Sequence, residues 1–233
     1  MTSLLNIERL SKYMRELKVW VFISASIPLI ILLFEFLFGA LGFDPLDRIT
    51  RMTGRAALIL LLASLLITPL RHWLMWIAIH VKAHYGKRLS DWNWLIKLRR
   101  MIGLFSSFYA SLHLIIYVWL DQGANLTRIL SDIYERKFIL VGVAAFILLI
   151  PVTVTSTDNM RRKLGKNWRR IHRLVYLIAI LAVTHFWMLT KVGVYDPYPY
   201  IAAVVLLLGW RVWYIYGISE DETPNDGMEV TPR

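Results

Sequence analysis

Three histidines fall within strongly apolar stretches and are the side chains best suited to chemistry. His113 lies in one such stretch, and His172 and His185 share another, RRIHRLVYLIAILAVTHFWML. Imidazole can bind a haem iron, relay protons or form a hydrogen bond between helices. Because an ionisable group is costly inside a bilayer, three of them on two helices favour a cofactor or a proton pathway over a purely structural role.

Depth in the membrane separates these histidines into two groups. His113 follows Arg100 by 13 residues, and His185 follows Arg170 by 15 residues. At 1.5 Å per residue, each lies about 20 Å along its helix from a basic cytoplasmic boundary. We therefore predict that they face each other in the outer half of the bilayer as the two axial ligands of one haem. His172 lies roughly 20 Å closer to the cytoplasm, where the other helix offers only arginine, so its partner stays open.

The other three histidines belong to a mixed aromatic and basic stretch at 71–95. We predict that this stretch forms an interfacial amphipathic helix on the cytoplasmic face. His72, His80 and His84 lie on this stretch, and His80 and His84, four residues apart, would share one face of that helix. No zinc pattern such as HExxH accompanies them. We interpret them as part of a polar face, while His80 or His84 remains open as a ligand on the inner side.

The composition is that of a membrane protein, and its apolar runs indicate which helices would position the histidines. The chain has 233 residues, is 57% hydrophobic and has a mean hydropathy of +0.51. It has no cysteine, which excludes disulfides, thiolate metal sites and iron–sulfur clusters. We predict an all-α integral membrane protein, a six-helix transmembrane bundle with haem between the helices. The predicted spans are 19–39, 54–70, 101–120, 137–155, 171–190 and 198–216.

Charge sets the expected orientation. The segments before the first span and at the second and fourth connections carry 18 Lys and Arg residues, against 7 on the other side. This bias places both termini in the cytoplasm and accounts for the net charge of +11 without a nucleic-acid partner. We predict a cytoplasmic amphipathic segment at 1–18, the membrane domain at 19–216 and a disordered acidic tail at 217–233.

The connection TSTDNMRRKLGKNWRR at 155–170 has the pattern of a short helix between two spans. Gly165 would end that helix and Asn167 would cap the next one. Its first residue would be capped by Thr157, Asp158 or Asn159. Arg169 and Arg170 beside a helix N-terminus suit a phosphate or a haem propionate, although topology alone would also place arginine there.

One arginine on the opposite side is also a candidate. Arg55 follows Gly54 at the outer end of the second span, and it is a candidate propionate partner for the outer haem. No G-x-G-x-x-G or P-loop pattern occurs, so the chain is not expected to bind a nicotinamide or hydrolyse a nucleotide.

Three long runs resemble a known family. They are DPLDRITRMTGRAALILLLASLLITPL at 44–70, SLHLIIY at 111–117, and TSTDNMRRKLGKNWRRIHRLVYLIAILAVTHF at 155–186. They resemble the MsrQ (YedZ) family, the haem-binding membrane subunits of bacterial periplasmic methionine sulfoxide reductase systems. This family lies within the wider ferric-reductase-like transmembrane family. The resemblance covers most of residues 40–216.

The resemblance implies the cofactors and the role. It implies b-type haem, one or two, with His113, His172 and His185 as the matching histidines, together with FMN and a location in the bacterial inner membrane. Electrons would pass across the membrane to MsrP, a periplasmic molybdenum enzyme that repairs oxidised methionine in proteins. The chain itself would not act on methionine sulfoxide and would have no catalytic residue of its own.

The chain departs from the related NADPH oxidases in two ways. It lacks an inner histidine on the span that carries His113, and it lacks a nucleotide-binding domain. We therefore expect a separate electron donor, either a cytosolic flavin reductase or a quinol. The alternative function is a proton-coupled transporter that uses the buried histidines as a relay. It is disfavoured because no Gly/Pro-interrupted spans occupy matching positions in two halves.

Overall fold

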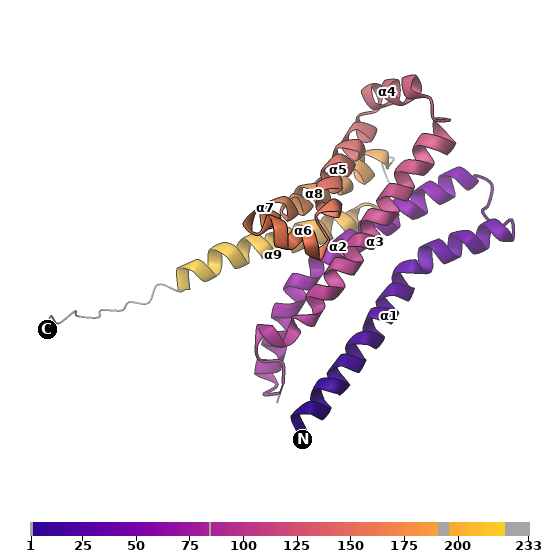
Figure 1. Ribbon diagram of the computed structural model, residues 1–233. Helices are drawn as coiled ribbons and strands as arrows, with labels where there is room; N and C mark the ends of the chain where they lie inside the picture. Colours follow the sequence, from indigo (N-terminus) through magenta and orange to yellow (C-terminus); the bar gives the residue numbers. More distant parts are fainter. Residues whose placement is uncertain (1, 84, 191–195, 222–233) are drawn as a thin grey trace.

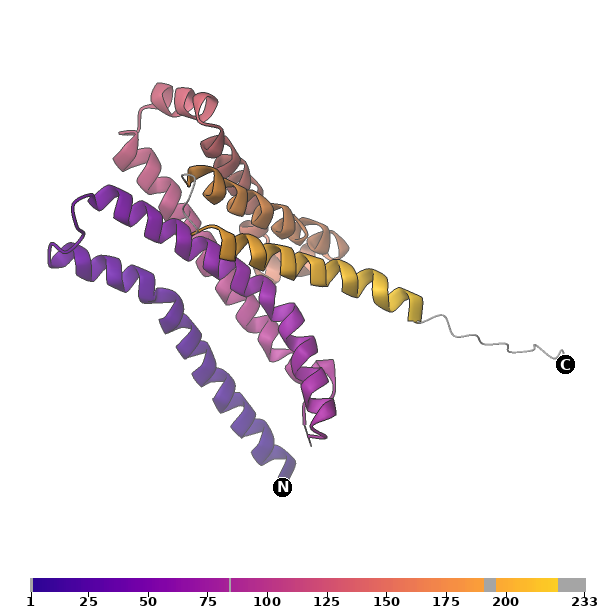
Figure 2. The ribbon, with the colours of Figure 1, turned by 180° about the vertical axis from the view of Figure 1, so that it is seen from behind.

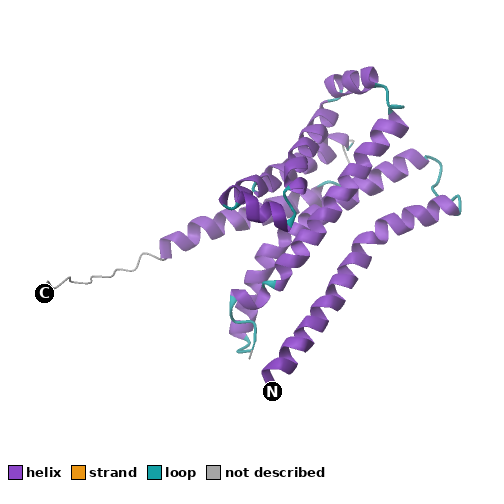
Figure 3. Cartoon of the chain, in the orientation of Figure 1, coloured by secondary structure: helices purple, strands orange, loops and turns teal. Residues whose placement is uncertain are grey.

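A computed structural model describes residues 2–83, 85–190 and 196–221, with side chains for residues 16–83, 85–190 and 196–214. This part of the chain is helical apart from short turns, which confirms the all-α prediction (Figure 3). The elements in chain order are α1 (Thr2–Leu37), α2 (Pro45–His80), η1 (Leu89–Trp92), α3 (Trp94–Ile116), the π-helical turn η2 (Tyr117–Asp121), α4 (Leu126–Glu135), α5 (Lys137–Val154), α6 (Asp158–Leu164), α7 (Lys166–His172), α8 (Leu174–Leu189) and α9 (Tyr198–Asp221).

Five segments of the described chain are long and apolar enough to cross a membrane. They are Glu16–Leu37, Pro45–His80, Leu89–Asp121, Lys137–Val154 and Lys166–Leu189. Each contains, wholly or for the most part, one of the first five predicted spans. The sixth predicted span coincides with α9, which is not among the five.

Two helix pairs form the centre of the molecule. The first pair is α2 with α3, and the second is α5 with α8 (Figure 1). A core of buried aliphatic side chains joins α2, α5, α8 and α9, and it includes Leu61, Leu149, Ile178 and Val204. Seen from behind, α9 runs beside α2 and α8, while α1 stands on the other side of α2 (Figure 2). The two central pairs are therefore held against each other by aliphatic packing at one level and are free to enclose a space at another.

Helix α2 is longer than the sequence predicted. Asp44 caps its start by accepting a hydrogen bond from the Asp47 amide at 3.0 Å. Pro69 removes one backbone hydrogen bond without ending the helix, and no glycine follows it before residue 80. The helix ends where Lys82 adopts a left-handed φ of 52°. Residues 71–80 thus continue α2, and no separate helix covers 71–95.

Helix α1 contains residues of the predicted N-terminal segment, since it is continuous from Thr2. Pro28 lies inside it and has no N–H to donate. On either side of this proline the α1 backbone is bonded to Tyr109 of α3, whose hydroxyl donates to the Ala25 carbonyl at 2.8 Å and accepts from the Leu29 amide at 3.2 Å. The fully buried Tyr109 therefore fixes α1 to α3 at this point.

The connection at 155–170 folds largely as predicted. Thr157 caps α6 by accepting from the Met160 amide at 3.3 Å, and Gly165 ends it with a φ of 50°. The expected Asn167 cap is absent, because α7 already begins at Lys166 with Gly165 in the capping position. At the other terminus α9 extends to Asp221, so residues 217–221 are helical, and the remainder of the predicted disordered tail lies outside the described residues.

Candidate functional site

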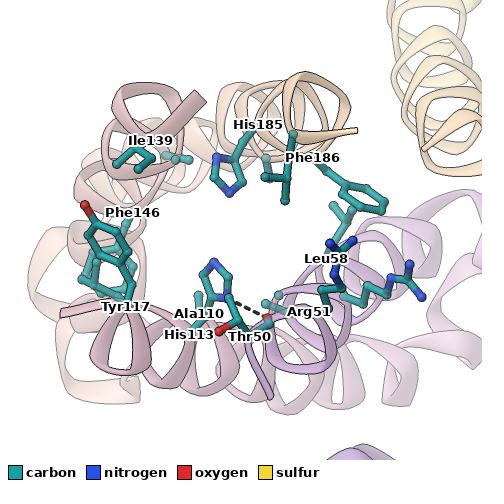
Figure 4. A pocket seen from close by; sticks show the side chains of 18 of the residues that line it. Thr50, Arg51, Leu58, Ala110, His113, Tyr117, Ile139, Phe146, His185 and Phe186 are labelled. Atoms are coloured by element: carbon teal, nitrogen blue, oxygen red, sulfur yellow. Dashed lines mark hydrogen bonds between the residues drawn. The ribbon is translucent and has the colours of Figure 1, made fainter. Parts of the chain in front are cut away.

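His113 of α3 and His185 of α8 point toward each other across an internal space (Figure 4). Their ring centroids are 6.3 Å apart, and the ring planes are inclined by 81°. The structure therefore brings together the two histidines that the depth argument paired. Each belongs to a different helix pair, so the space between them is the interface of the two pairs.

The backbone of a neighbouring helix holds each ring. The Nδ1 atom of His113 lies 3.0 Å from the Thr50 carbonyl oxygen of α2. The Nδ1 atom of His185 lies 2.6 Å from the Phe138 carbonyl oxygen of α5. Because a carbonyl oxygen only accepts, Nδ1 must carry the proton in both hydrogen bonds. In a neutral ring this leaves Nε2 with a free lone pair, which is the state of a histidine that binds a metal.

A glycine one turn beyond each carbonyl lets the ring lie against the helix. A Cβ atom at Gly54 would lie 3.2 Å from Cε1 and Nδ1 of His113. A Cβ atom at Gly142 would lie 2.7 Å from Nδ1 of His185. The same arrangement thus occurs twice, with a carbonyl at one position and a glycine four residues later. Sequence reasoning missed both glycines as site residues, because the rings that contact them come from other helices.

The space between the histidines is a cavity of about 460 Å³, within the usual range for a small-molecule or cofactor site. Its walls come from α2, α3, α5 and α8 and are mainly apolar. They include Leu58, Leu61, Ala110, Phe146, Leu149 and Ile178. An apolar interior with two facing imidazoles suits a large, mostly apolar cofactor that contains a metal.

Three arginines line the cavity together with these apolar walls. Arg55 pairs with Asp196, and its guanidinium carbon lies 5.9 Å from the centre of the Phe186 ring. The Nε atom of Arg55 is buried and has no hydrogen-bond partner. A buried donor without an acceptor is costly, so this arginine suits an anionic group entering the cavity. Sequence reasoning had selected Arg55 for this role.

The other two arginines were missed. Arg51 pairs with Asp47 at 2.6 Å, one turn earlier on the same helix. Arg136 pairs with Asp132 at the corner between α4 and α5. Each lies next to a predicted span, so a search of the span ends for arginine would have found both.

Asp132 lies at the rim of the cavity nearest α4. Its carboxylate is buried, with 9% of the residue exposed. It accepts hydrogen bonds from the Tyr117 hydroxyl at 2.7 Å and from the Gln122 amide at 3.3 Å, in addition to its ion pair with Arg136. Tyr117 and Gln122 lie within and just beyond the π-helical turn η2. Asp132 therefore links that turn to Arg136.

His172 lies apart from this cavity. Its Nε2 atom is 3.3 Å from the Thr155 hydroxyl, and its ring stacks on Trp168 with the centroids 4.0 Å apart. Trp168 in turn donates to the Thr155 carbonyl at 2.9 Å. Among the side chains that the structure describes, no group of three metal-binding residues surrounds it. Arg169 and Arg170, on the same short helix, are exposed.

The remaining histidines are bonded within their own helix. His72 has Nδ1 at 2.9 Å from the Thr68 carbonyl, and its ring contacts Trp210 and Tyr214 of α9. His80 is exposed, with Nδ1 at 2.9 Å from the Trp76 carbonyl. His84 lies outside the described residues.

Comparisons with known proteins agree with this architecture. The family model described as "Ferric reductase like transmembrane component" matches residues 53–183, more than half of the chain. This range includes α3 with His113, and it ends two residues before His185. No solved structure matches the chain significantly.

Three similar proteins share one name, "Protein-methionine-sulfoxide reductase heme-binding subunit MsrQ". The protein from Xanthomonas campestris pv. campestris (strain B100) is 45% identical over 174 residues, which are 75% of this chain and 72% of the relative. That from Herminiimonas arsenicoxydans is 42% identical over 204 residues, 86% of each. That from Ralstonia nicotianae is 38% identical over 209 residues, 88% of each. The chain therefore belongs to the MsrQ family of ferric-reductase-like transmembrane proteins.

Proposed function

We propose that this protein is the haem-binding membrane subunit of a protein-methionine-sulfoxide reductase system and that it carries electrons across the inner membrane. The observation that carries the proposal is the facing pair His113 and His185, each with Nδ1 bonded to a backbone carbonyl. The names of the relatives supply the system to which such a subunit belongs.

The separation of the two rings supports a single metal ion between them. Metal–imidazole bonds are about 2 Å long and each nitrogen lies roughly 1 Å from its ring centroid, so two such ligands place their centroids about 6 Å apart. The observed separation is 6.3 Å. When bound, a b-type haem would supply one-electron redox chemistry at this point.

The chain's own residues would hold and insulate that cofactor. Thr50 and Phe138 fix the orientation of the two imidazoles through their carbonyl oxygens. Arg55, with its free Nε atom, and Arg51 and Arg136 are available for the cofactor's carboxylates. The aliphatic walls exclude water, so the site favours electron transfer over the binding of an external ligand.

We further propose the six-span topology, with α9 as the last span and both termini in the cytoplasm. The excess of Lys and Arg at the expected inner connections supports it. In Figure 1 the N-terminus and the turn after α2 lie at one end of the bundle, and α4 lies at the opposite end. The cavity with its three arginines is then nearer the periplasmic face, where electrons would leave.

The partners follow from that orientation. The acceptor is the periplasmic catalytic subunit MsrP, which would dock on the outer connections at 121–136 and 191–199. Asp132 and Asp196, which these connections contribute, are already paired with Arg136 and Arg55, so among the described residues Asp121 and Glu135 are the exposed acids without an arginine partner there. The donor is a cytosolic flavin reductase or a quinol, with FMN as a second cofactor on the inner side, where His172 lies.

Haem content and ligation test the proposal directly. In the purified protein, His113→Ala and His185→Ala should each remove the same low-spin haem, measured by pyridine haemochrome and electron paramagnetic resonance. His80→Ala, which removes an exposed imidazole far from the cavity, should retain it. A colourless wild-type protein would instead support the transporter alternative and overturn the proposal.

A further inference from the structure

Two arginines at the end of the bundle opposite α4 have no acidic partner among the described side chains. Arg99 of α3 and Arg211 of α9 are both half-buried beside Tyr176 of α8. The guanidinium carbon of Arg211 lies 5.1 Å from the centre of the Tyr176 ring. Arg99 interacts electrostatically with both Tyr176 and Arg211. Among the described side chains, its one hydrogen-bond partner is the Thr68 hydroxyl, at a long distance of 3.4 Å.

This pair differs from most of the arginines whose contacts the structure describes. Arg48, Arg51, Arg55, Arg100 and Arg136 each contact a carboxylate, and Arg71 donates instead to the Leu89 carbonyl and the Asn93 side-chain oxygen. Arg99 and Arg211 contact no described carboxylate. Two neighbouring cations repel each other strongly where water is scarce, and charged residues of membrane helices are normally paired. The arrangement is therefore complete only with an anion between or beside them.

The surroundings indicate what kind of anion would fit. His172, stacked on Trp168, lies within electrostatic reach of Arg99. Thr68, which accepts from Arg99 through its hydroxyl, also contacts His72 through its carbonyl. The His72 ring in turn contacts the stacked pair of Trp210 and Tyr214. Cationic and aromatic side chains are thus gathered around the two arginines, as suits an anionic ligand with a planar ring system.

We propose that Arg99 and Arg211 bind the phosphate group of a phosphate ester on the cytoplasmic side of the bundle. Planar guanidinium groups match the oxygen geometry of phosphate and keep their charge when partly buried. Two sources share this chemistry, the phosphate of FMN and the headgroup of a phospholipid. The aromatic neighbours favour FMN. The choice of FMN as the ligand rests on the proposed electron-transfer function, whereas the phosphate site itself does not.

Titration of the purified, haem-loaded protein with FMN, followed by flavin fluorescence, tests the site. Arg99→Gln and Arg211→Gln should each weaken FMN binding about tenfold or more, because each removes a charge-assisted contact. Lys97→Gln removes an exposed charge from the same helix and should change binding less than about twofold. Riboflavin, which lacks the phosphate, should bind wild type as weakly as FMN binds the variants, and inorganic phosphate should compete with FMN.

The controls separate this site from the haem site and from lipid. An unchanged low-spin haem spectrum shows that each glutamine variant is folded, and Arg99→Lys should recover part of the affinity. His185→Ala should lose haem and still bind FMN, so the two proposals can fail independently. If FMN does not bind but native mass spectrometry finds a phospholipid that Arg99→Gln loses, the phosphate site stands with a lipid occupant.

Two outcomes would overturn the proposal. The first is that neither FMN binding nor phospholipid retention depends on Arg99 and Arg211. The second is a wild-type ratio of two haems per protein that falls to one in Arg99→Gln, because the anion would then be a haem carboxylate. Each outcome is read from quantities other than sulfoxide reduction.

Discussion

Gly142 approaches His185 so closely that no other residue fits at position 142 without moving the ring. A Cβ atom there would lie 2.7 Å from Nδ1, 2.9 Å from Cε1 and 3.2 Å from Cγ of the imidazole. The contact to Gly54 at His113 is looser, at 3.2 Å. Both histidines therefore lie against a glycine, but position 142 leaves less space for a larger side chain than position 54 does.

Gly142→Ala should displace His185 and weaken haem ligation, because overpacking a closely packed site costs about 1–3 kcal/mol. Gly54→Ala should have a smaller effect in the same direction. Gly103→Ala is the matched control, since nothing lies within 4 Å of a Cβ atom at this helical position. Haem content and the low-spin electron paramagnetic resonance signal measure the difference. Equal losses in Gly103→Ala and Gly142→Ala would contradict the role of the close contact.

His172→Ala should leave the haem at the cavity low-spin, because His172 lies outside the cavity and contacts Thr155 and Trp168. It should slow reduction of that haem by a reduced flavin supplied from the cytoplasmic side. Stopped-flow absorbance in proteoliposomes measures the rate. If His172→Ala removes all haem while His185→Ala keeps a six-coordinate signal, then His172 is the true partner of His113.

Asp132→Asn should raise the midpoint potential of the haem, on the order of tens of millivolts, because it removes a negative charge beside Arg136 at the cavity rim. Loss of negative charge disfavours the oxidised iron, which carries the extra positive charge. Glu135→Gln removes an exposed carboxylate from the same helix and should leave the potential unchanged. Spectroelectrochemical titration measures the midpoint potential of both variants. A lowered potential in Asp132→Asn would contradict this prediction.

Tyr109→Phe should lower stability by about 1–3 kcal/mol, because it leaves the Ala25 carbonyl and the Leu29 amide without their partner inside the bundle. Tyr134→Phe is the control, since Tyr134 is 89% exposed on α4. Thermal unfolding in detergent, followed by loss of the haem absorbance band, compares the two. Equal midpoints would show that the hydroxyl is not needed where α3 contacts α1.

Reporter fusions should locate positions 45, 125 and 195 in the periplasm and positions 85 and 160 in the cytoplasm, because 18 of the Lys and Arg residues fall on the inner side. The fusion at 195 lies between α8 and α9, so it decides whether α8 crosses fully. A cytoplasmic signal there would show that α8 does not cross and would contradict the six-span topology.

The sequence predicted the pairing of His113 with His185 because axial rise along a helix is nearly constant. Counting residues from the basic boundaries therefore gave relative depth without any knowledge of packing. The same counting set His172 apart. Apolar runs likewise located the five candidate spans, since hydrophobic length is a property of one segment alone.

Features that depend on the rotation of one helix against another were not predicted. The contacts of Gly54 and Gly142 with imidazole rings arise only once α2 meets α3 and α5 meets α8. Tyr117, which bonds to Asp132, begins a π-helical turn, and no sequence pattern predicted that turn. The extension of α2 beyond residue 70 was missed because its aromatic and basic side chains were read as an interfacial surface rather than as helix continuation.

The division of the cavity between two helix pairs has a consequence for biogenesis. Thr50, Gly54 and His113 belong to α2 and α3, so the first half of the site is complete before α5 is synthesised. His185, on α8, comes late in translation. A group ligated by both histidines can be locked in place only after α8 has entered the membrane. Cofactor capture is therefore a late step in maturation, and a nascent chain halted before α8 would carry a prepared but open half-site.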